Sequence, residues 1–295
     1  MLPTGKPEEV GIDGVRLARA FDLLRGWLDD GTLPGAVALV ARRGIVIGRC
    51  AFGNAAKPPA RRPIGPDTLF AVASLTKPFI ATAIMQLVEA GRLSLDHPVR
   101  ELLPEFAGPG TEAITLRHLL THTAGLPEYC PDNEDIRARQ LGLEAFVRSY
   151  CRGTPTTTPG ESWSYSNYGF GLAGEIIARA TGQSYHRIVA DDILAPLGMR
   201  NSFLLPPEAV WDRIAWVWLP DEPDTDHQRY NSGYFRKLRI PWGGLYTTRE
   251  DLAVFAQAFL NGGTYGDRRI LSPASVHEMT RNQLAANCGT GVTRT

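Results

Sequence analysis

The sequence shows no excess of charge of either sign and no long hydrophobic run. Its 295 residues include 31 basic and 31 acidic side chains, so the formal net charge is zero. Nucleic-acid-binding proteins usually show a basic footprint, and a membrane-spanning helix needs about 20 mostly apolar residues. No such run occurs in the sequence. We therefore predict that neither nucleic acid nor a membrane is a partner.

Closely spaced cysteines are also missing. The four cysteines, Cys50, Cys130, Cys151 and Cys288, are scattered without a C-x-x-C pair. Zinc sites and redox-active dithiols usually contain such pairs. We therefore predict that the four thiols are reduced and packed. The carboxylates do not cluster either, so we predict no metal and no cofactor.

The first ten residues contain no apolar segment of the kind found in signal peptides. On this basis we expect a cytoplasmic protein. With 43% hydrophobic residues the chain can bury a sizeable core, and its length predicts one large domain or two smaller ones.

The hydrophobic pattern predicts a hairpin near the start and a long helical middle. Apolar residues at helical spacing predict a helix over residues 14–30. Two β-rich runs around the turn at Gly44 predict an antiparallel hairpin over residues 36–52. Further helices are expected at 74–90, 115–121, 143–150, 168–181 and 185–194, with an irregular stretch at 203–241. A capping box from Thr247 to Glu250 then predicts a helix to Leu260, and Ser272 begins a last helix to about Gln283.

The first candidate for chemistry is an S-x-x-K pattern, Ser74 to Lys77, in a chain with only four lysines. Residues at i and i+3 share a helix face, so the amine can approach the hydroxyl. A serine hydroxyl needs a neighbouring base, and a lysine serves when burial lowers its pKa. We predict that Ser74 caps its helix, where the helix dipole favours an oxyanion. The alternative is a simple cap followed by a surface lysine.

A second pattern, Tyr165-Ser-Asn167, follows about ninety residues later. A phenol near Lys77 can pass a proton from Ser74 to a leaving group, and the Asn167 amide can orient the substrate or the lysine. The alternatives are a core aromatic residue for Tyr165 and a helix N-cap for Asn167.

Other hydrolytic patterns have less support. A Ser-His-Asp hydrolase would typically show a G-x-S-x-G elbow, which does not occur, and His118 and His122 fall on a leucine-rich predicted helix. Trp242, with three tryptophans at 211–218, either lines an acyl pocket or packs in the core.

Taken in order, these motifs resemble those of the serine β-lactamase and penicillin-binding-protein superfamily. The matching segments are F-A-V-A-S-L-T-K at 70–77, L-R-H-L-L-T-H-T-A-G-L-P at 116–127, the stretch 159–167, and G-G-L-Y-T-T at 243–248. A Y-x-N motif instead of S-D-N is most like class C β-lactamases and the related family VIII-type carboxylesterases. The resemblance extends from about residue 10 to 283.

The resemblance implies an α/β (α+β) fold, in which an antiparallel sheet flanked by helices carries an inserted helical lobe. Residues 1–295 would form one domain, with an α/β lobe at 1–68 plus 240–295 and a mainly helical lobe at 69–239. It also implies roles for individual residues, which are Ser74 as acylated nucleophile, Lys77 as base, Tyr165 as proton relay, and Asn167, Trp242 and Gly243 as substrate-binding residues.

The chain departs from the superfamily at its third motif, a K-T-G, K-S-G or H-T-G on a strand beside the nucleophile. None occurs after Tyr165, and we expect the nearest match, G-T-G at 289–291, to leave no room for a strand and its neighbours. We therefore expect a sheet that is incomplete at the C-terminus. Exposed strand edges can pair with another chain, so a homo-oligomer is expected.

Together these features predict a serine hydrolase that forms an acyl-enzyme at Ser74. The expected substrate is a small-molecule ester or amide, most of all a small carboxylic ester, with weak β-lactamase activity in addition. The alternative is a truncated, non-catalytic remnant, or a penicillin-binding-type protein that is acylated without turnover.

Overall fold

A computed structural model describes residues 1–57, 59–218, 230–284 and 288–290. The α-helices are α1 (Gly14–Asp29), α2 (Lys77–Glu89), α3 (Val99–Leu102), α4 (Leu116–Leu120), α5 (Asn133–Ala138), α6 (Leu143–Tyr150), α7 (Asn167–Thr181), α8 (Tyr185–Val189), α9 (Gly233–Leu238), α10 (Arg249–Leu260) and α11 (Pro273–Thr280). The strands are β1 (Gly35–Arg42), β2 (Ile45–Gly53), β3 (Phe70–Ala71), β4 (Ser162–Trp163), β5 (Ser202–Phe203), β6 (Tyr246–Thr247), β7 (Thr264–Tyr265), β8 (Arg268–Arg269) and β9 (Gly289–Thr290). Short 3-10 or π turns are η1 (Pro7–Val10), η2 (Ala73–Thr76), η3 (Ala190–Leu194) and η4 (Glu208–Arg213).

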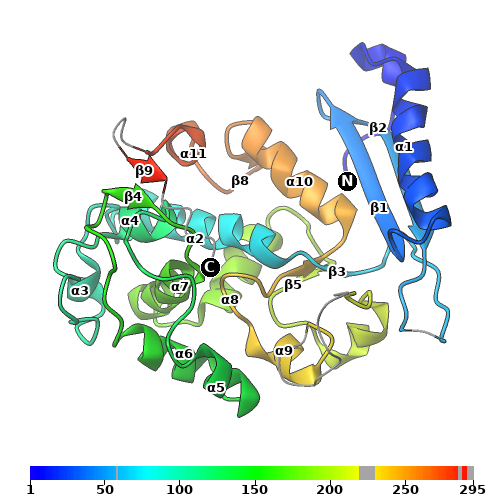
Figure 1. Ribbon diagram of the computed structural model, residues 1–295. Helices are drawn as coiled ribbons and strands as arrows, with labels where there is room; N and C mark the ends of the chain where they lie inside the picture. The colour runs from blue at the N-terminus through cyan, green and yellow to red at the C-terminus, as the bar shows by residue number, and fades with distance from the viewer. Residues whose placement is uncertain (58, 219–229, 285–287, 291–295) are drawn as a thin grey trace.

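The N-terminal hairpin forms as the sequence predicts. Strands β1 and β2 pair in antiparallel fashion around a turn in which Arg43 and Gly44 both have positive φ. Helix α1 packs on this pair (Figure 1) because Gly48 leaves room for it. A Cβ at Gly48 would lie 2.6 Å from the ring of Phe21 and 3.2 Å from Leu17. Within the described residues, β1 forms ladder pairs with β2 alone.

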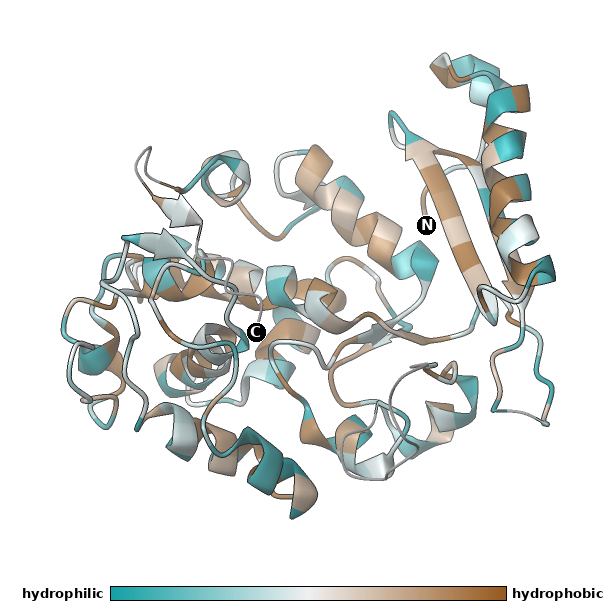
Figure 2. Cartoon of the chain, viewed as in Figure 1, coloured by the Kyte–Doolittle hydropathy of each residue, from teal (hydrophilic) through white to brown (hydrophobic). Residues whose placement is uncertain are grey.

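Helix α10 joins the hairpin to the helices on the other side of the molecule (Figure 1). It packs against β1, while its Phe255 stacks on Phe79 of α2 with ring centroids 3.8 Å apart. Figure 2 shows that β1 is largely hydrophobic, whereas α5, at the far side of the helices, is largely hydrophilic. The hairpin and the helices are therefore linked through apolar contacts of α10.

The main hydrophobic core lies among the helices. Helix α2 is buried along most of its length and packs against α7 and α8, while α7 also contacts α4 and α6. Gly171 of α7 permits this approach, since a Cβ there would lie 2.2 Å from the Tyr150 ring of α6. The same core continues into Leu245, Tyr246 and Val254, so it extends across the predicted lobe boundary at 239/240. The boundaries of the two lobes stay a prediction.

Several helix ends agree with the sequence. Gly91 and Gly182 follow α2 and α7 with φ of 67° and 72°, as expected for glycines that end helices. The predicted capping box at Thr247 is wrong by one residue. Thr247 belongs to β6, and the N-cap of α10 is Thr248, whose side chain accepts from the N–H of Asp251. The last helix, α11, ends at Thr280 instead of Gln283.

The mixed α/β architecture with antiparallel pairs agrees with the predicted fold. The other strands are short. β3, β6 and β5 form an antiparallel sheet, and β7 pairs with β8. The expectation that 289–291 leaves no room for a strand is wrong in part, because Gly289 and Thr290 form β9, which pairs in parallel with Ser162 and Trp163. Gly291 lies outside the described residues.

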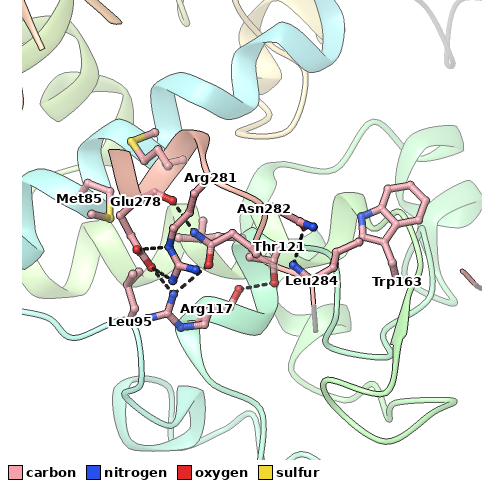
Figure 3. A pocket seen from close by; sticks show the side chains of 13 residues that line it. Met85, Leu95, Arg117, Thr121, Trp163, Glu278, Arg281, Asn282 and Leu284 are labelled. Carbon is pink, nitrogen blue, oxygen red and sulfur yellow. Dashed lines mark hydrogen bonds and ion pairs between the residues drawn. The ribbon is translucent and has the colours of Figure 1, made fainter. Parts of the chain in front are cut away.

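A cavity of about 280 Å³ lies between α4 and α11, closed on one side by a cluster of charges (Figure 3). The Glu278 carboxylate accepts from Arg117 Nη1 at 2.6 Å and from Arg281 Nε at 2.5 Å. Arg117 also donates to Asp96 at 3.1 Å. Hydrogen bonds from Arg281 and then from Arg117 lower the pKa of Glu278 to about 2. These contacts join α11 to α4.

Among the described residues, no helix is long and apolar enough to cross a membrane.

We expect Glu278→Gln to destabilise the protein at neutral pH. Because the folded-state pKa lies below the ordinary value of 4.5, the ion pairs stabilise the fold above pH 4.5, and this contribution is lost as the pH falls toward 2. The side chains are partly exposed, so the expected loss is about 1 kcal/mol or less. Urea unfolding at several pH values measures it. Glu112→Gln, at a loose 3.8 Å pair with Arg100, is the control. A difference between wild type and Glu278→Gln that does not shrink at low pH would contradict this explanation.

Candidate active site

Ser74 lies in the turn between β3 and α2. It belongs to the 3-10 turn η2, and the N-cap of α2 is Thr76, so the prediction that Ser74 caps the helix is wrong. Ala73, directly before it, has φ of 46°, a left-handed conformation that costs a residue with a Cβ about 1–3 kcal/mol. Thr76 holds this turn, because its hydroxyl donates to the Ala73 carbonyl and accepts from the N–H of Leu245.

The structure brings Ser74, Lys77 and Tyr165 together. Ser74 Oγ and the Tyr165 hydroxyl lie 2.6 Å apart. Lys77 Nζ lies 3.1 Å from Ser74 Oγ and 2.6 Å from the Tyr165 hydroxyl. The three polar atoms form a triangle in which each is within hydrogen-bond distance of the other two. A proton can therefore move among them without any large side-chain motion.

Lys77 is buried, with 6% of its surface exposed, and two further oxygens contact its amine. Asn167 Oδ1 lies 2.8 Å from Nζ and the carbonyl oxygen of Trp242 lies 2.9 Å away. Both of these oxygens only accept hydrogen bonds, so they occupy two N–H groups of the lysine. A neutral amine has two N–H groups and one lone pair. In that form its lone pair faces the hydroxyls of Ser74 and Tyr165, the arrangement that a general base needs.

The pKa of Lys77 agrees with this geometry. Burial lowers it to about 8, although the negative charge of Glu128 raises it in part. A pKa near neutrality leaves a useful fraction of the amine uncharged at pH 7 and keeps it basic enough to accept a proton.

Asn167 is the first residue of α7, and Ser166 is the N-cap whose hydroxyl accepts from the N–H of Gly169. The Asn167 amide has a defined orientation. Its Nδ2 donates to Glu128 Oε1 at 3.2 Å, so its Oδ1 faces Lys77. The Glu128 carbonyl also accepts from the backbone N–H groups of Asn167 and Tyr168. One N–H of the amide is thus bound to the protein, and the second, without an acceptor in the described part of the chain, can donate to a ligand.

Trp242 contributes its backbone carbonyl to the site and is also among the residues that line the cavity beside Ser74. The ring is buried, with 3% of the residue exposed, and packs edge-on against Phe146 and Tyr150. The ring therefore packs in the core, as one interpretation of the sequence predicts, while the carbonyl accepts from Lys77. Because Trp242 also lines the cavity, its role in an acyl pocket stays a prediction. Gly243 lines the cavity beside Ser74. The tryptophans at 211, 216 and 218 are absent from the described lining of that cavity.

The cavity at Ser74 has a volume of about 230 Å³. Its described lining includes Ser74, Asn167 and Gly243, and Tyr129 and Arg137 are among the lining residues that sequence reasoning did not select. Both residues lie after the matching segment that ends at the L-P pair at 126–127, in a stretch that contains no recognisable motif. Glu128 was missed for the same reason, although an acidic residue directly after a matching segment was the available signal.

His122 was expected to lie on a helix with His118, and this is wrong because α4 ends at Leu120. His122 has φ of 60°, and its Nδ1 accepts from the N–H of Ser166 at 3.0 Å. Burial, with the charge of Lys77 nearby, lowers its pKa to about 4, so the ring is neutral and supports the turn before Asn167. The described residues contain no group of three or more side chains suited to a metal ion.

The chain is similar in sequence and in fold to known proteins. The model of the family described as Beta-lactamase matches residues 20–294. Esterase EstB of Burkholderia gladioli is 34% identical over 239 residues, which cover 76% of this chain and 60% of EstB. The chain therefore spans about three fifths of the length of that curated relative.

Two solved structures show the same fold. A penicillin-binding protein homologue from Caulobacter crescentus has a TM-score of 0.77 at 28% identity, covering 91% of this chain and 76% of its own. A class C β-lactamase in complex with cefoxitin has a TM-score of 0.71 at 29% identity, covering 91% of this chain and 70% of its own.

The pKa of Lys77 predicts how the reactivity of Ser74 depends on pH. Labelling of Ser74 by a fluorophosphonate should speed up as the pH rises and level off above about 8, since the neutral amine is the base. Glu128→Gln removes the charge that raises this pKa, so the rise should move to lower pH. Labelling rates from pH 5.5 to 9.5 measure both effects. Glu144→Gln, a change on α6, should leave the profile unchanged. A flat profile, or a shift to higher pH in Glu128→Gln, would show that Lys77 is not the base.

Proposed function

The chain belongs to the beta-lactamase family, and from that membership we propose that it is a serine hydrolase that cleaves small carboxylic esters through an acyl-enzyme on Ser74. The observation that carries the proposal is the buried Lys77 amine, within hydrogen-bond distance of both the Ser74 and Tyr165 hydroxyls. The similarity to an esterase supports an ester as substrate.

In the first half of the proposed reaction, Ser74 Oγ attacks the ester carbonyl as its proton moves to the Lys77 amine. The tetrahedral intermediate then collapses, the bond to the alcohol oxygen breaks, and Tyr165 gives that oxygen a proton that Lys77 replaces. The products are an ester of Ser74 and a free alcohol. In the second half, a water loses a proton to the same pair and attacks the acyl carbonyl, which releases the acid and restores the Ser74 hydroxyl.

The negative oxygen of the intermediate needs a donor. The backbone N–H of Ser74 forms no backbone hydrogen bond within the described part of the chain, and it lies at the start of the helical segment that leads into α2. We assign it to the oxyanion. Donors of this kind are worth about 10²–10³ in rate each.

The second candidate is a penicillin-binding-type protein that acylates and stops. One observation favours it. The G-T-G match to the third motif begins with Gly289 and Thr290, which pair with β4 and are not part of the described lining of the Ser74 cavity. In the superfamily that the chain resembles, the strand of the third motif supplies a second oxyanion donor. That donor is therefore not part of the proposal, and slow turnover follows unless another group takes its place.

Intact-mass analysis after incubation with a fluorophosphonate and with a penicillin tests the nucleophile. We expect one adduct on the wild type, none on Ser74→Ala, and an unchanged adduct on Ser164→Ala, a matched serine outside the triangle. Loss of 4-nitrophenyl butyrate hydrolysis in Ser74→Ala should accompany this. Tyr165→Phe should slow hydrolysis by about 10²–10⁴, the usual contribution of a general acid–base group.

The outcomes separate the candidates. Turnover of the ester supports the esterase, whereas a stable adduct without turnover supports the penicillin-binding-type protein. Ester hydrolysis that survives Ser74→Ala, or a wild type that forms no adduct, would overturn the proposed mechanism.

A further inference from the structure

The cavity at Ser74 contains a buried cation that the proposed chemistry does not use. Arg137, on α5, lines this cavity together with Ser74, and only 9% of its surface is exposed. Its guanidinium carbon lies 5.5 Å from the centroid of the Phe146 ring, so the ring covers one face of the group.

The orientation of Arg137 is fixed at one end. Its Nε donates to Asn133 Oδ1 at 3.1 Å, one turn earlier on α5. The Asn133 amide is itself oriented, because its Nδ2 donates to Glu134 Oε1 at 2.7 Å. Since Nε is used in this way, the guanidinium keeps four N–H groups on Nη1 and Nη2.

These four N–H groups have no acceptor among the described residues, and no carboxylate of the described chain lies within ion-pair distance of Arg137. A buried charge without a partner is costly, and a guanidinium fork matches a carboxylate through two parallel hydrogen bonds. Glu134, which is held by Asn133, also lines the cavity. The carboxylate of a ligand would therefore meet one guanidinium that lies next to one fixed negative charge. The fork and the burial favour a planar anion at a defined position.

The position of Tyr165 decides which part of a substrate reaches Arg137. The leaving alcohol has to face the Tyr165 hydroxyl, which gives it a proton. The described lining of the cavity includes Ser74, Asn167 and Arg137, but not Tyr165. The acyl part therefore enters this cavity, while the alcohol lies on the side of Tyr165.

We propose that Arg137 binds a carboxylate on the acyl part of the substrate, so that the preferred substrates are monoesters of dicarboxylic acids. This inference rests on the proposed function and names its substrate class. Arg137 is then a specificity-determining residue, which acts on binding of the acyl chain and leaves the chemistry at Ser74 unchanged.

Paired esters of equal chain length test the proposal. The 4-nitrophenyl monoesters of glutaric and adipic acid are compared with 4-nitrophenyl pentanoate and hexanoate, after subtraction of the hydrolysis without enzyme. We expect the wild type to prefer the acidic ester of each pair. Arg137→Met keeps the apolar stem, and it should lower kcat/KM for the acidic esters by about 10- to 100-fold, as loss of hydrogen bonds to a charged group does. Hydrolysis of the neutral esters should stay within about twofold.

Two further variants control the interpretation. Arg137→Lys keeps the charge without the fork, so it should retain part of the preference and also serves if Arg137→Met does not fold. Arg139→Met, on the same helix but with its guanidinium bonded to Asp135, should behave as the wild type. A wild type without preference for the acidic esters, or equal losses on both esters in Arg137→Met, would overturn the proposal.

Binding without turnover separates this proposal from the proposed function. Adipamate, the monoamide of adipic acid, carries the same carboxylate and no reactive ester. Isothermal titration calorimetry should show that it binds to the wild type and at least about tenfold more weakly to Arg137→Met. If no ester is cleaved but adipamate binding depends on Arg137, the hydrolase proposal fails and the carboxylate site stands. If adipamate does not bind, or binds equally to both proteins, the carboxylate site fails.

Discussion

The burial of one amine organises the centre of this protein. Lys77 sits at the start of α2, against a core that tolerates little polarity, so each of its hydrogen-bonding positions has to meet an oxygen. The Trp242 carbonyl and the Asn167 amide meet two of them, and the hydroxyls of Ser74 and Tyr165 meet the rest. The same burial lowers the pKa to about 8. Packing that stabilises the helices thereby also favours the neutral amine that the proposed mechanism needs as its base.

The surrounding segments keep these groups at their distances. Helix α7 begins at Asn167, and the carbonyl of Glu128 accepts from the first two N–H groups of that helix. The Glu128 carboxylate orients the Asn167 amide, while His122 accepts from the N–H of Ser166. A short loop after α4 thus positions a tyrosine and an asparagine that lie about forty residues later. The apolar contacts of α10 with α2 and β1 link the hairpin to the helices that carry the site.

The cavity at Ser74 suggests how a fold found in esterases, β-lactamases and penicillin-binding proteins can differ in what it accepts. In the proposed function, the triangle of Ser74, Lys77 and Tyr165 supplies the chemistry for any acyl chain. We propose that selection falls to side chains such as Arg137 on α5, a short and largely hydrophilic helix (Figure 2) that lines the cavity with Asn133, Glu134 and Arg137. In this proposal, a change at Arg137 alters the preferred substrate and spares the nucleophile.

The sequence by itself determined the hairpin, the main helices and the pairing of Ser74 with Lys77 and Tyr165, because apolar spacing, glycine stops and motif order are local signals that burial reinforces. The helix starts predicted at Thr247 and Ser74 were wrong, because tertiary contacts decide them. Thr247 pairs with Phe70 in a sheet, and Ser74 lies in a separate 3-10 turn before α2. Only the tertiary structure decided that Trp242 acts through its carbonyl, that Glu128 orients Asn167, and that Arg137 enters the cavity. Each of these depends on contacts between residues far apart in the chain, or on which face of a short helix is buried, and no local pattern encodes such contacts.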